Sequence, residues 1–359
     1  MFFSIDSDTG DAITGWLAPD NPSQIPKIEV RIKGRSEALV EANILRPDVR
    51  DLGLHGSGQV GFSITNESVP GLAAARDIEI LEADTRTPLY RRFQPDQHIE
   101  RKLFLFDCSA MPQRTLIESL TPHFSLNYTN SERYSLETMI VLLTNQFSKS
   151  IFFTGRSSFS RYANFLESGG YIRAAVLREP LEELAERLLF LKFLSKPNTE
   201  HLLPTFATGL LPLVNFARSL DFDNPKALLQ SFRQIDESQR QALISPMVRM
   251  LGCTLDEQPS YSAVSLALDH LASLDVVGTR ERFSTFKAML EQFIGGVTLR
   301  YEPPTTFPTV KELASTLSGN GIVLDLLEHD IALYGYVEVS LATSLSGQRQ
   351  VAPRDTQTI

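Results

Sequence analysis

Three near-continuous apolar stretches constrain the fold of this chain more than any other feature. They are residues 102–107 (KLFLFD), 150–154 (SIFFT) and 171–177 (YIRAAVL). Strands that are apolar at successive positions, without alternation, are typical of a parallel sheet buried on both faces. Segments with helical periodicity lie between and after them, which indicates right-handed crossovers. We therefore expect an α/β domain with helices on both faces of a parallel sheet.

The clearest helical segment in the sequence is residues 181–195. It begins just after Pro180, and prolines favour the first turn of a helix. Its apolar side chains recur on one face, while charged side chains occupy the rest. These apolar residues are Leu181, Leu184, Ala185, Leu188 and Leu189. Most of the stretch 205–295 repeats this pattern, so we expect it to be largely helical.

The first 95 residues have a different pattern, in which apolar and polar residues alternate. Residues 28–34, 60–64 and 78–81 alternate with period two between turn signals, which predicts a small all-β sandwich. A chain of 359 residues exceeds the size at which one core usually stops growing. We expect a β-sandwich domain over 1–97 and an α/β domain over 98–345. The polar segment 346–359 has no periodicity and is expected to be a disordered tail.

The charge balance restricts the partners of the chain. It has 34 Lys and Arg against 43 Asp and Glu, a formal net charge of −9. A non-specific nucleic-acid binder needs a basic face, so this class is not expected, although a local basic pocket for a small anion stays open. The sequence has no apolar run long enough to span a bilayer and no signal-like start, which predicts a cytoplasmic protein. The oligomeric state is left open.

Cysteine and histidine residues give no metal-binding pattern. Cys108 and Cys253 are far apart and lie in no CxxC motif, so we expect two packed, reduced thiols. The six histidines show no ligand spacing. No metal is expected.

Two sets of motifs carry a resemblance to known families. Gly15-Trp16, residues 46–49 (RPDV), Leu52-Gly53 and Gly61-Phe62 resemble a β-sandwich module that accompanies bacterial polysaccharide-modifying transferases. Residues 107–116, 151–159, 175–186, 267–283 and 326–334 follow one another as in the polysaccharide-type sulfotransferases. That family uses 3′-phosphoadenosine 5′-phosphosulfate as sulfuryl donor. The resemblance, over about 102–340, implies a P-loop-like three-layer fold, a nucleotide donor and a carbohydrate acceptor.

The loop after the first apolar strand is where the family binds the 5′-phosphosulfate. Backbone N–H groups and a helix N-terminus surround the anion there, and a cation adds charge. This chain reads DCSAMPQRTL over 107–116, without the usual glycines. The resemblance implies that Arg114 and Thr115 are anion ligands, with Gln113 where lysine is usual. The alternative is an ordinary strand-to-helix turn with Arg114 in solvent.

The segment 151–159 ends its strand in Gly155-Arg156, where the family has Gly-His. In relatives the histidine can accept the proton of the acceptor hydroxyl. Arginine does not deprotonate in proteins, so Arg156 is expected to hold an anionic sugar or the sulfate instead. With Arg114 it forms the predicted catalytic pair. The alternative for Arg156 is a surface cation at the end of a strand.

Residues 175–186 match the strand–Arg–Asp–Pro–helix signature, in which an arginine and a later serine bind the nucleotide 3′-phosphate. Arg178 stands at the arginine position, and its planar fork suits a phosphate. Glu186 stands at the serine position, where its charge would repel the phosphate. The alternative for Arg178 is a structural role at a strand-to-helix junction.

Two functions follow from this resemblance. The first is transfer of a sulfuryl group from a nucleotide donor to a carbohydrate hydroxyl, in the synthesis of a bacterial surface polysaccharide. The second is a non-catalytic glycan-binding or scaffolding protein that keeps the transferase fold but has a degenerate donor site. The missing glycines, Arg156 and Glu186 favour the second function. The acceptor, its linkage and the role of the sandwich are left open.

Overall fold

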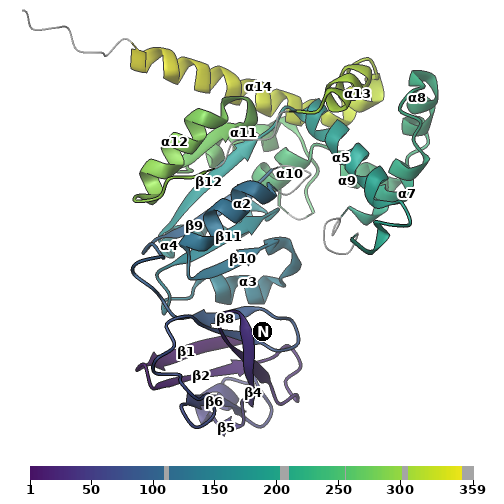
Figure 1. Ribbon diagram of the computed structural model, residues 1–359. Helices are drawn as coiled ribbons and strands as arrows, with labels where there is room; N and C mark the ends of the chain where they lie inside the picture. Colours follow the sequence, from purple (N-terminus) through teal and green to yellow (C-terminus); the bar gives the residue numbers. More distant parts are fainter. Residues whose placement is uncertain (109–112, 203–209, 255, 301–305, 350–359) are drawn as a thin grey trace, which may run out of the picture.

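The computed structural model describes residues 1–108, 113–202, 210–254, 256–300 and 306–349. Antiparallel sheets form the N-terminal β region, residues 1–91, drawn in purple in Figure 1. A parallel sheet and most helices form the α/β region, residues 102–349 (Figure 1). Among the described helices, none is long and apolar enough to cross a membrane.

The β region contains two four-stranded antiparallel sheets, ordered β1-β2-β6-β5 and β4-β3-β7-β8. The strands are β1 (Phe2–Asp8), β2 (Ala12–Ala18), β3 (Lys27–Ile32), β4 (Arg35–Glu41), β5 (Ile44–Leu45), β6 (Gln59–Thr65), β7 (Ile78–Glu82) and β8 (Pro88–Arg91), with one short helix, α1 (Pro47–Asp51). The three alternating stretches seen in the sequence are β3, β6 and β7. Lys33 and Gly34 join β3 to β4 with φ of 50° and 74°, the left-handed backbone that a two-residue hairpin requires.

The parallel sheet confirms the three apolar strands expected from the sequence. It has five strands in the order β10-β11-β9-β12-β13, and every neighbouring pair is parallel. They are β9 (Lys102–Asp107), β10 (Leu126–Thr129), β11 (Ile151–Gly155), β12 (Tyr171–Leu177) and β13 (Val276–Thr279). The first strand along the chain, β9, therefore lies at the centre of the sheet.

Helices cover both faces of the parallel sheet. Alternate residues of the strands point to opposite faces, and they belong to two separate apolar clusters. Leu103 and Leu105 pack with α2 (Arg114–Leu120) and α12 (Phe283–Ile294). Phe104 and Phe106 belong to the cluster that includes α3 (Leu136–Leu143), α4 (Phe159–Ser168) and α11 (Tyr261–Ala272). The expected α/β class with helices on both faces is thus confirmed.

A third apolar cluster lies among helices at the carboxyl end of the sheet. These helices are α5 (Pro180–Leu194), α7 (Leu211–Ser219), α8 (Pro225–Arg233), α9 (Glu237–Leu243), α13 (Pro308–Ser318) and α14 (Gly321–Arg349), and α10 (Pro246–Gly252) lies between them and the sheet. Short 3-10 turns complete the described structure: η1 (Thr121–His123), η2 (Ser131–Arg133), η3 (Glu200–Leu202) and η4 (Arg280–Arg282). Helix α5 is close to the predicted segment 181–195 and begins one residue earlier, at Pro180. Helix α14 continues to Arg349, past Ser346, where the sequence predicts that regular structure stops; residues 350–359 lie outside the described residues.

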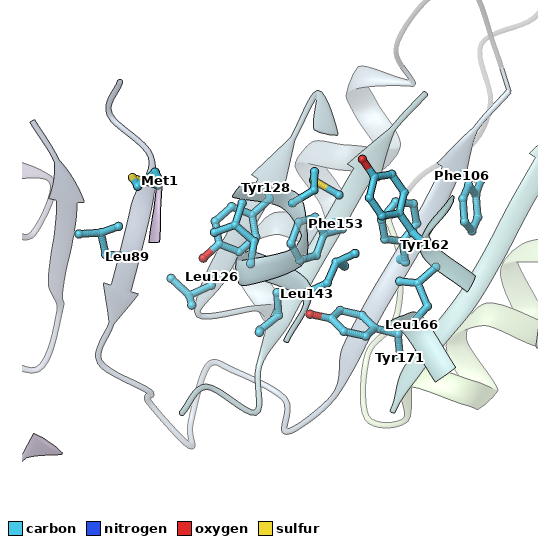
Figure 2. Close-up of a cluster of buried hydrophobic side chains, with 14 of the residues drawn as sticks. Met1, Leu89, Phe106, Leu126, Tyr128, Leu143, Phe153, Tyr162, Leu166 and Tyr171 are labelled. Carbon is cyan, nitrogen blue, oxygen red and sulfur yellow. The ribbon is translucent and has the colours of Figure 1, made fainter. Parts of the chain in front are cut away.

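Apolar side chains join the β region to the α/β region. Figure 2 shows Met1 and Leu89 of the β region facing Leu126 and Tyr128 of β10, and all four belong to one buried cluster. The Tyr128 hydroxyl donates a hydrogen bond of 2.9 Å to the carbonyl oxygen of Pro88. Between them, the chain from β8 to β9 packs its side chains inward at Gln94 and His98, which are 5% and 4% exposed. The two regions therefore share a core.

Candidate functional site

A cleft of about 500 Å³ opens at the carboxyl ends of β9, β10 and β11. We call it the arginine cleft because four arginines line it, one from each of four segments. Among its described lining residues, the charged ones are Asp107, Glu132, Arg156, Arg161, Arg187 and Arg249. In open parallel sheets, ligands bind outside the carboxyl ends of the strands where the strand order reverses. Strand β9 is the central strand from which the chain turns first to one side and then to the other, so the cleft lies at such a point.

Arg156 reaches the cleft because β11 ends in a glycine. Gly155 has φ of 153°, and a Cβ there would collide with the backbone nitrogen and hydroxyl of Ser131 and the carboxylate of Glu132. The absence of a side chain lets turn η2 approach the end of β11. The Arg156 backbone N–H then donates a 3.0 Å hydrogen bond to Glu132 Oε2. Burial lowers the pKa of the Arg156 guanidinium, and the nearby charge of Arg187 lowers it further.

Arg187 comes to the cleft from helix α5, two turns after Pro180. Its Nη2 donates to both carboxylate oxygens of Glu183, at 2.8 and 2.7 Å, and the two side chains are 5% and 4% exposed. Its Nη1 donates to the carbonyl oxygen of Ala242 at 3.3 Å. A buried charge is tolerated only when it is paired and hydrogen-bonded. Glu183 therefore holds one of the four cleft arginines in a fixed position.

Arg249 is placed by helix α10, and that helix is anchored by a buried carboxylate of α14. Asp330 accepts hydrogen bonds from the backbone N–H groups of Met247 and Val248, at 3.0 and 2.8 Å. Those N–H groups belong to the first turn of α10, where they have no partner inside the helix. Burial raises the pKa of Asp330 to about 7. Arg249 itself contacts Gln241 of α9 at 2.9 Å, and burial lowers its pKa.

Arg178 and Glu186, both predicted to face the nucleotide 3′-phosphate, form an ion pair with each other instead. The Arg178 side chain has no exposed surface; its Nη1 forms an ion pair with Glu186 Oε2, and its Nη2 lies 3.6 Å from Glu182 Oε2. Arg280 Nη1 lies 3.4 Å from the same Glu186 oxygen. Burial lowers the pKa of Arg178, and Arg280 adds to this effect. Carboxylates of the chain itself thus surround the guanidinium.

The loop residues predicted for the 5′-phosphosulfate lie elsewhere. Arg114 begins helix α2, and its side chain is 74% exposed and paired with Glu118 at 2.7 Å. Thr115 is exposed as well. The Gln113 backbone N–H donates to Asp107 Oδ2 at 3.3 Å, at the end of β9. The rest of that loop, residues 109–112, lies outside the described residues.

Of the predicted site residues, only Arg156 is among the described residues that line the arginine cleft. Gln113, Arg114, Thr115, Arg178 and Glu186 are not. Sequence reasoning missed Arg161, Arg187 and Arg249, which come from three helices far apart in the sequence. The spacing of Glu183 and Arg187, four residues apart on a helix, was the one local signal for a fixed charge. Nothing local connects Arg249 to Arg156.

Both cysteines are free, buried and in the wall of the arginine cleft, as expected of packed thiols. Burial, together with the charge of Asp107, raises the pKa of Cys108 well above its usual value, which keeps it a neutral thiol. Within the described residues, no cluster of histidine, cysteine and acidic side chains could hold a metal ion.

No family model matches this chain, and no curated protein matches it in sequence.

Proposed function

We propose that this chain is a sulfotransferase-like protein that binds an anionic carbohydrate in the arginine cleft and has a degenerate donor site. The observation that carries the proposal is the contrast between two groups of arginines. In the cleft, Arg156, Arg161 and Arg249 are partly exposed in the lining of an open cavity, whereas Arg187 is buried and paired with Glu183. Arg178, which the resemblance assigns to the donor, is fully buried among carboxylates of its own chain.

The cleft suits a ligand that carries sulfate or carboxylate groups. Guanidinium groups present paired N–H donors that match planar or tetrahedral oxyanions, and Arg is the usual residue for such contacts. Glu183 compensates Arg187. Arg156, Arg161 and Arg249 against Asp107 and Glu132 still leave the lining cationic in a chain of net charge −9. The carboxylates of Asp107 and Glu132 offer acceptors for sugar hydroxyls, whereas the buried hydroxyls of Ser131 and Ser157 hydrogen-bond to each other at 2.7 Å.

The expected 3′-phosphate contact conflicts with the position of Glu186. A phosphate near Arg178 would have to displace Glu186 and would meet Glu182 as well. In both cases the negative phosphate would lie close to a negative carboxylate. We therefore propose that 3′-phosphorylated nucleotides are not ligands of the wild-type chain. In this proposal, the two antiparallel sheets are the β-sandwich accessory domain that the sequence resembles, and the strand order around β9 is that of a P-loop-like domain.

A second candidate function is sulfuryl transfer within the arginine cleft itself, and Asp107 favours it. This carboxylate ends the central strand, is 6% exposed and lines the cleft beside the arginines. In such a reaction the acceptor hydroxyl oxygen attacks sulfur, the bond from sulfur to the donor's leaving oxygen breaks, and the proton passes to Asp107. The arginines would balance charge on the leaving group. The proposed location in either case is the cytoplasm.

Binding of a defined sulfated sugar tests the first proposal. We expect a heparin-derived tetrasaccharide to bind by calorimetric titration, and Arg161→Gln or Arg249→Gln to weaken it about tenfold, the usual effect of losing one hydrogen bond to a charged group. Arg76→Gln is the matched control, because Arg76 lies in the β region, exposed and paired with Asp96. Absence of binding, or an equal loss in the control, would overturn the proposal.

A separate measurement distinguishes the two functions. A ligand that binds the folded state raises the melting temperature. Because we propose that 3′-phosphoadenosine 5′-phosphate does not bind, we expect it to leave the melting temperature unchanged. Incubation with labelled 3′-phosphoadenosine 5′-phosphosulfate and a heptasaccharide acceptor should give no labelled sugar. Labelled product that disappears in Asp107→Asn would establish the second function instead.

A further inference from the structure

A second, smaller hollow of about 190 Å³ lies beside the arginine cleft, between the β region and the turn η2. Thr85 and Thr87, of the turn from β7 to β8, line it from one side. Arg133, Tyr134 and Ser135 line it from the other. Asp20, just after β2, completes its polar edge.

Tyr134 lines both the second hollow and the arginine cleft. Its ring lies edge to face with the buried ring of Tyr128, with centroids 6.3 Å apart and planes at 82°. Tyr128 in turn donates its hydroxyl to Pro88, in the β region. Tyr134 thus forms a ridge between the two hollows, and its contact with Tyr128 ties this ridge to both regions of the chain.

Arg133 adds a cation to this ridge. Its guanidinium lies 4.8 Å from the centre of the Tyr134 ring, and its Nη2 donates to the Tyr134 hydroxyl at 2.6 Å. The contact holds an exposed arginine and a half-buried aromatic ring in one position. Aromatic rings offer an apolar face with a polar edge, which suits the mixed surface of a sugar ring.

The polar groups differ between the arginine cleft and the second hollow. Four arginines line the cleft. The second hollow offers one arginine, threonine and serine hydroxyls, and the ion pair of the Asp20 carboxylate with the Met1 ammonium group. Hydroxyls and carboxylates pair with the hydroxyl groups of sugars. A ligand that fits both hollows therefore carries anionic groups at one end and hydroxyl groups along its length.

We propose that the two hollows form one groove for a linear acidic polysaccharide, with its charged groups in the arginine cleft and the following sugars passing over Tyr134 to the β region. This inference rests on the proposed function and adds to it the polymeric nature of the ligand. It gives the β region a role, because Asp20, Thr85 and Thr87 then contact the ligand. A single-stranded nucleic acid fits less well, since the path has one aromatic platform and several acidic side chains.

The test compares a heparin-derived disaccharide with an octasaccharide on the full chain, by calorimetric titration at one salt concentration. We expect the octasaccharide to bind at least tenfold more tightly than the disaccharide. Arg133→Gln should lower octasaccharide affinity about tenfold and leave disaccharide affinity unchanged, because Arg133 lines only the second hollow. Tyr134→Ala should weaken both sugars, because Tyr134 also lines the arginine cleft. Arg76→Gln should change neither. Arg133 is exposed, so its substitution reports on binding even if Tyr134→Ala perturbs folding.

Three outcomes would overturn the inference. If Arg133→Gln and Tyr134→Ala bind the octasaccharide like wild type, while Arg161→Gln does not, the cleft binds sugar but the groove ends there. If an eight-nucleotide oligothymidine binds as tightly as the octasaccharide and depends on Arg133, the ligand is a nucleic acid. If neither sugar binds, the proposed function fails, and this inference fails with it.

Discussion

At the scale of single residues, Glu186 has the largest effect on the interpretation of this chain. From the sequence, it stands where the family has a serine, which predicts repulsion of a bound phosphate. In the structure its carboxylate contacts two cations of the chain, Arg178 and Arg280. Glu182 and Glu186 are one turn apart on one face of α5, and Arg178 lies just before that helix begins at Pro180. That spacing could have indicated an internal ion pair before the structure was known.

Removing this carboxylate should destabilise the folded chain. Arg178 has no exposed surface, and a buried charge that loses its partner is costly. We expect Glu186→Gln to lower the free energy of unfolding by about 3 kcal/mol, the lower end of the range for breaking a buried pair. Urea unfolding of wild type and variant measures the difference.

A matched exposed pair provides the control. Arg114 and Glu118 are 74% and 58% exposed, and exposed pairs contribute less than about 1 kcal/mol. Glu118→Gln should therefore move the urea midpoint much less than Glu186→Gln. Equal shifts of the two urea midpoints would mean that the buried pair of Arg178 and Glu186 stabilises the chain no more than an exposed pair does.

Asp330 should make stability depend on pH. Its folded-state pKa is about 7, against an ordinary value of 3.8, so between these values the folded chain holds a proton that the unfolded chain releases. The free energy of unfolding then falls as pH rises, by at most about 1.4 kcal/mol per pH unit, and levels off above pH 7. Relative to Asp330→Asn, wild type should lose about 2 kcal/mol from pH 5 to pH 7. Parallel pH profiles from urea unfolding would refute this assignment.

At the scale of elements, the sequence predicted the strands that are buried on both faces and missed the short or exposed strands that are held by pairing with a neighbour. Strands β9, β11 and β12 are buried on both faces, which leaves continuous apolar runs. Strand β10 has four residues at the edge of the sheet, and two of them are only partly buried. Strand β4 is largely exposed, and β5 has two residues. Such strands are held by backbone hydrogen bonds to their neighbours, and backbone bonding leaves little trace in residue type.

The candidate site was less predictable than the fold for a related reason. Arg156 follows an apolar strand and a glycine, so its place at the carboxyl end of the sheet could be inferred. Arg161, Arg187 and Arg249 reach the cleft through the packing of α4, α5 and α10. A single sequence does not contain that packing. The loop of Arg114 resembles an anion loop, but helix α2 begins at Arg114 and directs its side chain into solvent.

The junction of β11 with turn η2 makes a prediction about Gly155. A Cβ at this position would meet backbone and side-chain atoms of Ser131, as well as Glu132. We expect Gly155→Ala to destabilise the chain by about 2–3 kcal/mol, the range for overpacking a rigid contact, and to weaken sugar binding because Arg156 moves. Thermal unfolding and calorimetric titration measure the two effects.

Gly170 separates backbone strain from collision. It has φ of 68°, but a Cβ there meets no atom within 4 Å. Gly170→Ala should therefore cost only about 1 kcal/mol. If it costs as much as Gly155→Ala, the close approach of η2 to β11 is not what requires the glycine.

At the scale of the whole molecule, charge and packing are distributed differently. The chain is acidic overall, yet its arginine cleft gathers four arginines at the carboxyl ends of β9, β10 and β11. Apolar packing extends across the domain boundary that the sequence predicts between residues 97 and 98. Met1 and Leu89 belong to the same buried cluster as Leu126 and Tyr128 (Figure 2).

This shared cluster predicts that the β region and the parallel sheet unfold together. Exposing either one alone would leave apolar side chains of the other in water, at roughly 25 cal/mol per Å². The chain offers a direct test, because its single tryptophan, Trp16, lies in β2. Trp16 fluorescence reports the β region, whereas far-ultraviolet circular dichroism reports mainly the helices of the α/β region.

We expect the two signals to change at one urea concentration, as they do in a cooperative transition. Tyr128→Phe, which removes the hydrogen bond to Pro88, should lower both midpoints together, by about 1 kcal/mol of unfolding free energy. The ring of Tyr128 and its apolar contacts remain in that variant, so the coupling itself should survive. A Trp16 transition that separates from the dichroism transition in wild type would show that the β region unfolds on its own. The groove across Tyr134 would then join two independently stable parts. A sugar that contacts both regions stabilises only the chain in which both are folded. Sugar binding should therefore bring the Trp16 and dichroism midpoints together.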